Sequence, residues 1–408
     1  MPAAIVGQEK QTNTDTESGG RPANCAENPE TFMVNACSTR VNRPIAFAAA
    51  LTLALSGCAA PPAQNAAHED LGASYVKAGQ SAQGTPIAHT LSIDRDLENR
   101  ILALDPERIT EQDVKKTLAL GPTPRIILSH GGVILVYMAM ESFGTFLIGM
   151  GYPEDRIRDP HDGAFSQNPY MSSERIAGQV AWHYEHGGVR PMLIGHSQGG
   201  MQTIKVLHDL AGDFGDKIPV WNPVTDRAEP RYTIVDSLTG ETRPVVGTSA
   251  SYASVVGAGG LEFWAPTAWS MIGRLRQIPD SVEEFTGFYI RGDPVALTFP
   301  TGANDLDEYR QTGHAVVHNV NLPANYNHVF VPNTELLAYD PQTRDWINSH
   351  GMEAKADTSS VPDASKDNVL WAAVVWHDIK KHWCLEAQRL IRARSGQGRS
   401  SSSQSAQR

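Results

Sequence analysis

The sequence predicts an α/β fold in which a mostly parallel β-sheet is flanked by helices. Two apolar, strand-like segments, residues 126–128 and 192–194, each run into a glycine-rich turn. After the second turn, apolar residues recur at helical spacing as far as Gly212; they are Met201, Ile204, Leu207 and Leu210. Strands that alternate with helices in this way form βαβ units and parallel sheets.

The first 57 residues are expected to be a polar extension followed by a secretory signal peptide. Arg40 and Arg43 precede an apolar run at residues 44–55. The run is shorter than the roughly 20 residues that span a bilayer, and its basic flank is typical of a signal peptide. Residues 1–32 are polar and partly acidic, so we expect translation to start at Met33 or slightly later.

The apolar run ends in Leu55-Ser56-Gly57-Cys58, which resembles the lipobox of bacterial lipoproteins. This resemblance implies that the Cys58 thiol is lipidated and that Cys58 becomes the mature N-terminus. The protein would then be anchored to a membrane of the bacterial cell envelope, on the outer-membrane or periplasmic side. Residues 58–86 are rich in Pro, Ala, Gln and Gly and are expected to form a flexible tether. The alternative for residues 44–55 is a short buried helix.

Composition favours one folded domain, residues 87–394, followed by a Ser/Gln/Arg-rich tail, residues 395–408, that is expected to be disordered. The net charge is −11 and no Lys/Arg-rich stripe occurs, which argues against a nucleic-acid partner. Within the predicted domain the only cysteine is Cys384, so no internal disulfide is expected.

The most informative motif is Gly195-His196-Ser197-Gln198-Gly199, a G-x-S-x-G pattern between the second strand and its helix. A sharp strand-to-helix turn around a serine requires small residues on both sides. The first backbone N–H groups of the following helix then point toward whatever the serine attacks. Because glycine is frequent in this chain (35 of 408 residues), a G-x-S-x-G pattern can occur by chance. The strand before it and the helix after it are what make it informative. A glycine-rich turn without a function is the alternative.

A second glycine motif, Ser129-His130-Gly131-Gly132, follows the strand at residues 126–128. A strand-helix-strand-helix-strand interval separates it from Ser197, and its glycines allow the backbone to approach another group closely. Acyl-transfer sites of this kind take one oxyanion donor from the residue after the nucleophile, here Gln198. The other donor comes from the loop after an earlier strand.

Together these motifs resemble the α/β-hydrolase superfamily of lipases and esterases, over a stretch from about Arg125 to about residue 350. The resemblance implies an α/β-hydrolase fold with a triad in the chain order Ser, Asp or Glu, His. It also implies Gly132, the residue after His-Gly, as the second oxyanion donor. Because members of such a superfamily share a mechanism and differ in substrate, the resemblance says little about specificity.

The predicted acid of the triad is Asp293. It lies in Arg291-Gly292-Asp293-Pro294-Val295 after an apolar strand at residues 288–290, and it resembles the Asp-Pro-Val turn found after a late strand in many lipases. An aspartate that only initiates a turn before proline is the alternative. Asp305 and Asp307 are the substitutes if Asp293 is not the acid.

The predicted base of the triad is His328. It lies in a loop, residues 323–328, after an alternating segment, residues 314–322, that reads as a strand. His314 and His318 belong to that segment and are expected on the faces of the sheet. Catalytic groups sit preferentially on loops held by a rigid scaffold, which favours His328.

Residues 219–280 are expected to be an insertion that influences specificity. Its first part is predicted to be a β-hairpin joining residues 231–235 to residues 243–246. Its aromatic-rich part, residues 261–272, is either a lid whose apolar face covers the site or ordinary core packing. After the triad, residues 333–347 and 367–394 have helical patterns.

These observations predict a serine hydrolase that cleaves carboxylic esters through an acyl-enzyme. Its partner would be a small-molecule ester with a hydrophobic acyl group, and neither a metal nor an organic cofactor is expected. Two alternatives remain. An acyltransferase would use the same Ser-Asp-His triad with a different acceptor, and a non-catalytic envelope lipoprotein could use the same scaffold.

Overall fold

A computed structural model of the chain describes residues 92–259, 266–290, 293, 295–296, 308–323, 326–351, 357–362 and 368–405. The predicted signal peptide, the lipidation site Cys58 and the tether lie outside the described residues. So do Asp305, Asp307 and residues 261–265 of the proposed lid.

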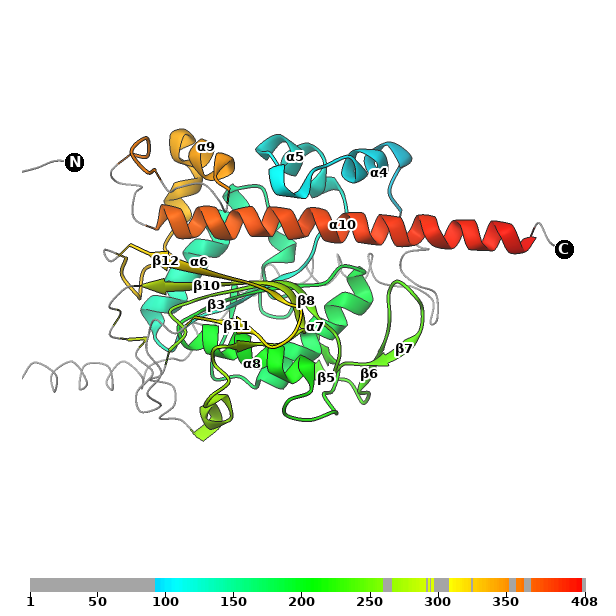
Figure 1. Cartoon of the computed structure of the whole chain (residues 1–408), viewed down its shortest axis with the longest axis horizontal. Helices are drawn as coiled ribbons and strands as arrows, with labels where there is room; N and C mark the ends of the chain where they lie inside the picture. The colour runs from blue at the N-terminus through cyan, green and yellow to red at the C-terminus, as the bar shows by residue number, and fades with distance from the viewer. Residues whose placement is uncertain are drawn as a thin grey trace, which may run out of the picture. The chain divides into compact units, whose positions relative to one another are not determined.

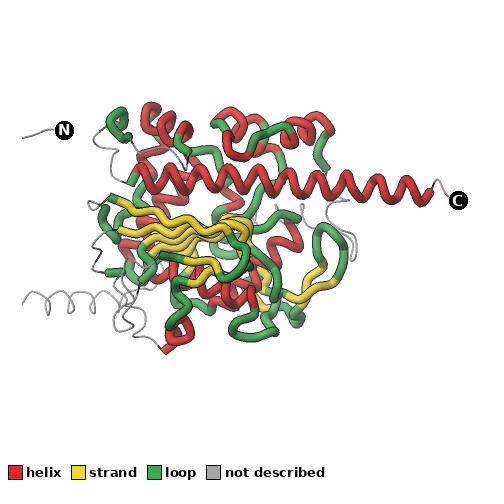
Figure 2. The backbone as a smooth tube through the Cα atoms, in the orientation of Figure 1, coloured by secondary structure: helices red, strands yellow, loops and turns green. Residues whose placement is uncertain are grey.

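A six-stranded sheet forms the centre of the fold, with the strand order β12-β10-β8-β3-β1-β2. Every pair of neighbouring strands in this sheet is parallel, and Figure 2 shows the strands side by side. The strands are β1 (Ile126–Ser129), β2 (Ser166–Gln167), β3 (Met192–His196), β8 (Ala250–Val256), β10 (Val282–Ile290) and β12 (Val316–Leu322). The prediction of a mostly parallel sheet flanked by helices is therefore confirmed.

Helices cover both faces of this sheet (Figure 1). One face packs against α6 and α10, and the other packs against α7 and α8. The main helices are α6 (Ile134–Gly149), α7 (Ser173–Gly187), α8 (Gln198–Ala211), α9 (Pro341–Ser349) and α10 (Val369–Ser405), with the shorter α4 (Arg95–Leu102) and α5 (Glu111–Lys116) before them. From β1 to β3 the chain alternates strand and helix, as the spacing of the two glycine motifs predicts.

The two-faced burial explains the apolar sequences of the strands. In β3, Met192 and Ile194 join the hydrophobic cluster beneath α6 and α10, whereas Leu193 joins the cluster beneath α7 and α8. Side chains alternate between the faces of a strand, so a strand covered on both faces must be apolar throughout. The sheet therefore holds the end of β3, and the serine after it, rigidly.

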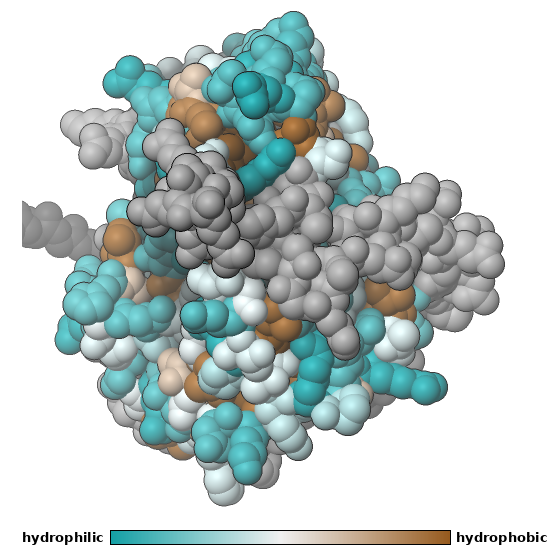
Figure 3. Space-filling view, turned by 90° about the vertical axis from the view of Figure 1, so that its right-hand side faces the viewer, coloured by the Kyte–Doolittle hydropathy of each residue, from teal (hydrophilic) through white to brown (hydrophobic). Residues whose placement is uncertain are grey.

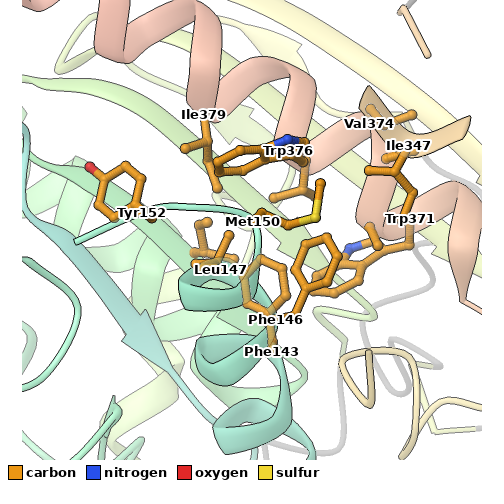
Figure 4. Packing of buried hydrophobic residues seen from close by; sticks show 14 of the residues in the cluster. Phe143, Phe146, Leu147, Met150, Tyr152, Ile347, Trp371, Val374, Trp376 and Ile379 are labelled. Atoms are coloured by element: carbon orange, nitrogen blue, oxygen red, sulfur yellow. The ribbon is translucent and has the colours of Figure 1, made fainter. Parts of the chain in front are cut away.

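Aromatic side chains fill the space between α6 and α10 (Figure 4). Trp371 of α10 is fully buried, and its ring centroid lies 4.6 Å from that of Phe143 of α6. Rings at this separation and tilt contribute beyond the area that they bury. The helical pattern predicted for residues 367–394 thus corresponds, over its described part, to α10, which packs against α6.

A buried ion pair attaches α10 to the beginning of β3. The Glu386 side chain, which is almost fully buried, accepts hydrogen bonds from the backbone N–H of Arg190 (2.6 Å) and from its Nε (2.9 Å). Arg190 lies two residues before β3. One buried carboxylate therefore joins segments that are 196 residues apart.

The insertion contains the predicted hairpin and an additional one. The strands β6 (Thr233–Val235) and β7 (Thr242–Pro244) pair antiparallel, which confirms the predicted hairpin. A second hairpin joins β4 (Trp221–Asn222) to β5 (Arg227–Ala228) and was not predicted. Each of its strands has two residues, which is too short for any alternating pattern to show.

The described part of the proposed lid has both buried and exposed apolar residues. Ala268 and Met271, in the 3₁₀-helix η7 (Pro266–Met271), are buried in the cluster on the α7 and α8 side, while Trp269 and Ile272 are exposed. In the next segment, Arg274 accepts a hydrogen bond at its carbonyl oxygen from Nε2 of His208 on α8 (3.3 Å). Core packing thus describes Ala268 and Met271 but not the exposed Trp269 and Ile272, and the choice between a lid and core packing stays a prediction.

The helical pattern predicted for residues 333–347 is interrupted in the structure. The pattern at residues 333–347 is not one helix but the 3₁₀-helix η8 (Glu335–Ala338) and α9, which is capped by the Asp340 side chain at the N–H of Thr343 (2.7 Å). Pro341 has no N–H and cannot continue a helix, but it suits the first helical position.

The C-terminal tail also differs from the prediction, because α10 continues to Ser405 rather than ending at residue 394. The prediction of disorder rested on composition. Adding a residue to an existing helix needs no new nucleation, so a polar segment can continue a helix that is already packed. The hydroxyl of Ser395 donates to the carbonyl of Ile391 (3.1 Å), one turn earlier in the helix.

In the part of the chain that the structure describes, no helix combines the length and the apolar character needed to cross a membrane. On the face shown in Figure 3, hydrophobic residues occur in small groups among hydrophilic ones.

Candidate active site

The G-x-S-x-G motif forms a strained turn between β3 and α8. Ser197 has φ 55° and ψ −123°, a backbone conformation that residues other than glycine rarely adopt. A Cβ on Gly195 would lie 2.5 Å from the carbonyl oxygen of Gly199, and a Cβ on Gly199 would lie 2.2 Å from that of Ser129. Only glycine fits at either position, so the motif is required by the geometry of the turn.

The structure brings the three residues selected for the triad into one chain of hydrogen bonds. Nε2 of His328 lies 2.9 Å from Oγ of Ser197, and Nδ1 of His328 lies 2.5 Å from Oδ2 of Asp293. A carboxylate only accepts hydrogen bonds, so Nδ1 carries the proton and Nε2 accepts from the serine hydroxyl. The three residues follow the ends of β3, β10 and β12, where ligand sites of parallel α/β sheets form.

The predicted acid and base are more buried than the predicted nucleophile. Asp293 is 4% exposed and His328 is 8% exposed, whereas Ser197 is half-buried. The carboxylate is held in place because its Oδ1 also accepts from the N–H of Val295 (2.9 Å). An incoming molecule can therefore reach the hydroxyl while the Asp293–His328 pair stays shielded from water.

The loop with the second glycine motif lies directly beside the serine. A Cβ on Gly131 would lie 2.9 Å from Cβ of Ser197 and 3.3 Å from its Oγ. Nδ1 of His130 donates to the carbonyl oxygen of Gly131 (2.7 Å), and burial lowers the pKa of His130, which favours its neutral form. Because a trans peptide points its N–H away from its C=O, this bond fixes the direction of the Gly132 N–H.

Tyr170, which the sequence did not single out, also holds this loop. Its hydroxyl donates to the carbonyl oxygen of Gly132 (3.2 Å), and a Cβ on Gly132 would meet that hydroxyl at 2.9 Å and Oε1 of Gln198 at 2.4 Å. Both predicted oxyanion residues, Gly132 and Gln198, thus lie together next to Ser197.

Two helix N-termini meet at the same place. Ser197 is the N-cap of α8, and Val133, just after the glycine loop, is the N-cap of α6. Neither N-cap residue satisfies a backbone N–H of its helix with a side-chain hydrogen bond. The positive ends of two helix dipoles favour negative charge that develops near Ser197.

Neither rejected histidine joins the triad residues, but only His318 lies on a strand. Because β12 begins at Val316, the prediction that His314 lies on a face of the sheet is wrong. His314 is exposed, and His318 on β12 lies 3.1 Å from Oε1 of Glu284. Burial alone would raise the pKa of Glu284, but hydrogen bonds from His318, His382 and Lys381 lower it below its ordinary value. Glu284 is near the beginning of β10, whereas Asp293 follows its end, so this cluster is at the opposite edge of the sheet.

Gly257 and His196 contribute to the site in ways that the sequence did not predict. Gly257 has φ +63°, and a Cβ there would lie 2.7 Å from Cε1 of His328. The imidazole of His196 contacts the backbone of His328. His196 is part of the G-x-S-x-G motif, but the motif does not show where the side chain of this residue points.

Among the described residues, no group of three or more His, Cys, Asp or Glu side chains is placed to hold a metal ion. Comparison of the chain with protein-family models, with curated proteins and with solved structures found no match. The function of the site is therefore inferred from its geometry alone.

Proposed function

We propose that this protein is a serine hydrolase of the α/β-hydrolase type that cleaves carboxylic esters. The observation that carries the proposal is the hydrogen-bond chain from Ser197 through His328 to Asp293. A nucleophile, a base and a group that orients the base, each within hydrogen-bond distance of the next, form the arrangement of nucleophilic catalysis. The strained turn and the two helix N-termini support the same reaction.

In the proposed acylation, Nε2 of His328 takes the proton of Ser197 as Oγ attacks the acyl carbonyl. Asp293 keeps the imidazole in the tautomer that can accept this proton and stabilises the imidazolium that forms. The backbone N–H groups of Gln198 and Gly132 bind the oxyanion, each lowering the barrier by about 3 kcal/mol. The imidazolium then gives its proton to the leaving alcohol.

In the proposed deacylation, His328 takes a proton from water as the water oxygen attacks the acyl-enzyme. The tetrahedral intermediate collapses, the carboxylic acid leaves, and the proton returns to Oγ of Ser197. No step uses a group from outside the chain other than the ester and water.

Exposed apolar side chains beside the site support a substrate with a hydrophobic acyl group. Ile134, Leu135 and Met138 lie in the first turns of α6, directly after the glycine loop, and are 44%, 50% and 57% exposed. Exposed apolar residues grouped next to a nucleophile provide a surface that an acyl chain can cover. The lipobox-like sequence ending at Cys58 supports the further proposal that the enzyme works at a membrane surface.

Hydrolysis of p-nitrophenyl esters of increasing acyl length tests this proposal. Ser197→Ala is expected to lower kcat by a factor of about 10⁴ or more, because the acyl-enzyme can no longer form. Ser359→Ala, which removes an exposed serine outside the triad, is the control and is expected to keep wild-type activity. Undiminished turnover by a folded Ser197→Ala variant would refute the assignment.

Adding an alcohol acceptor to the same assay separates hydrolase from acyltransferase. We expect the free carboxylic acid as the main product, since water can reach the half-buried Ser197. A transferred ester as the main product would keep the triad but replace hydrolysis by acyl transfer.

A further inference from the structure

His196 connects the nucleophile strand to the loop that carries the general base. It is the last residue of β3, directly before Ser197, and its side chain is completely buried. Its Nε2 lies 2.6 Å from the main-chain carbonyl oxygen of His328, 132 residues further along the chain. A single side chain therefore joins the residue before Ser197 to the backbone of His328.

The chemistry of this contact defines the state of His196. A carbonyl oxygen only accepts hydrogen bonds, so Nε2 must carry the proton. Nδ1 has no hydrogen-bond partner within the described part of the chain. Burial holds the pKa of His196 well below its ordinary value, and the nearby charge of His328 lowers it further. His196 is thus a neutral ring with one donor, and that donor is directed at His328.

The turn itself does not require a histidine at this position. Its close contacts demand glycine at 195 and 199, where an added Cβ would meet backbone atoms. The side chain of His196 instead reaches away from the turn, toward the loop after β12. The geometry of the turn therefore does not explain why residue 196 is a histidine.

The loop that His196 contacts is a hydrogen-bonded turn, in which the N–H groups of Phe330 and Val331 donate to the carbonyl oxygen of Asn327 (3.0 and 3.1 Å). Residues 328–332 form a turn outside any helix or strand. Its flanks are tied to the beginning of α10, because the Tyr326 hydroxyl accepts from the N–H of Leu370 (3.1 Å) and Nδ2 of Asn368 donates to the carbonyl of Phe330 (2.8 Å). The hydrogen bond from Nε2 of His196, at the end of β3, holds the backbone of His328 from the side of the sheet.

We propose that His196 is a positioning residue that holds the backbone of His328 so that its ring faces Ser197 and Asp293 at the same time. This inference rests on the proposed function of the Ser197–His328–Asp293 triad. With the carbonyl fixed, Nε2 stays 2.9 Å from Oγ of Ser197 while Nδ1 stays 2.5 Å from Asp293. Catalytic rates are sensitive to displacements of this size, since about 1 Å of misplacement can cost a factor of 100.

The neutral state of His196 matters for the same role. Its ring centroid lies 5.2 Å from that of His328. A positive charge so close would oppose the imidazolium that His328 forms when it takes the proton of Ser197. A neutral donor holds the base without disfavouring its protonation.

Three substitutions separate positioning from simple packing. In His196→Gln the amide nitrogen is the same number of bonds from Cβ as Nε2, so it can donate to the His328 carbonyl. His196→Asn has the same amide but is one bond too short, and His196→Leu has no donor. We expect His196→Gln to retain kcat within about threefold, and the Asn and Leu variants to lose about 10- to 100-fold in kcat with little change in KM.

A second readout does not depend on turnover. The proton shared by Nδ1 of His328 and Asp293 gives a far-downfield ¹H NMR signal when the two groups are held at hydrogen-bond distance. The signal is expected in the wild type and in His196→Gln, and to be broadened or absent in the Asn and Leu variants. All variants are assayed well below their thermal midpoints, with circular dichroism to verify folding.

The outcomes divide clearly. Folded Asn and Leu variants with wild-type kcat and an intact NMR signal would overturn the positioning role, as would a folded Gln variant as impaired as the Leu variant. If the Asn and Leu variants do not fold, the Gln variant alone decides, through its kcat and its signal. Failure of the proposed function is distinct, because the wild type itself would then neither hydrolyse esters nor react at Ser197, while the NMR comparison would still test the role of His196.

Discussion

At the scale of single residues, the site is built from close contacts that leave no freedom at a few positions. Ser197 adopts φ 55° because β3 and α8 are fixed in the packed sheet on either side of it. Strain of this kind persists only where the surroundings over-determine it, and it clusters at functional sites. The motif glycines make room for the turn at Ser197. Gly257, with φ +63°, in the same way makes room for the ring of His328.

Gly257→Ala is therefore expected to displace the base. The new Cβ would lie 2.7 Å from Cε1 and 2.9 Å from Nδ1 of His328, closer than any real contact of a Cβ. We expect kcat for ester hydrolysis to fall about 10- to 100-fold, because the ring must move from Ser197. Gly273→Ala is the matched control. It also has positive φ (+77°), but its Cβ would meet no atom within 4 Å.

Both alanine variants carry the cost of a left-handed backbone conformation, about 1 kcal/mol in the free energy of unfolding. Thermal denaturation measures this shared effect, and steady-state kinetics measures the difference between them. An equal loss of kcat in both variants would mean that backbone strain, and not the contact with His328, is responsible.

At the scale of secondary-structure elements, α8 combines two demands. Its N-terminus directs dipole and N–H groups at Ser197, and its buried face packs on the sheet. Near its C-terminal end it carries Asp209, which is almost completely buried. A carboxylate is disfavoured both by burial and by the negative end of the helix dipole.

Asp209→Asn is expected to stabilise the protein at neutral pH. Burial raises the pKa of Asp209 from 3.8 to about 6. The native state therefore keeps the proton in a range where the unfolded chain has released it. The stability that this proton contributes is present below pH 3.8 and is lost as pH rises through about 6.

Relative to the wild type, Asp209→Asn should gain about 2 kcal/mol in the free energy of unfolding as pH rises from 4 to 7. Urea denaturation at a series of pH values measures this. Asp216→Asn removes an exposed carboxylate just beyond the same helix and controls for net charge. A matching gain in that control would show a general charge effect and would contradict the role given to burial.

At the scale of the whole described domain, α10 completes the core on one face of the sheet. It supplies Trp371 and Trp376 to the cluster shared with α6, and Glu386 to the ion pair with Arg190 before β3. Its first turn and the residue before it also hold the His328 loop, through Leu370 and Asn368. A helix more than 170 residues after the serine thus supports both the strand that carries Ser197 and the loop that carries the base.

The parts of this domain that the sequence predicts are those with local patterns. The strand-turn-helix around Ser197 and the glycine loop at 131–132 follow from short motifs. The triad order Ser, Asp, His follows from the resemblance that these motifs carry, and the structure places the selected residues together. The parts that escape prediction depend on distant neighbours. The contacts of Tyr170 with Gly132 and of His196 with His328 join segments far apart in the chain, and no local periodicity reports them.

Labelling with a fluorophosphonate probe tests the central claim most directly. An activated serine displaces fluoride from such a probe, so Oγ becomes covalently bonded to phosphorus. We expect stoichiometric labelling of the folded wild type, with the adduct located by mass spectrometry on Ser197 and absent in Ser197→Ala. A folded wild-type protein that stays unlabelled, or that is labelled at another residue with Ser197 unmodified, would contradict the account.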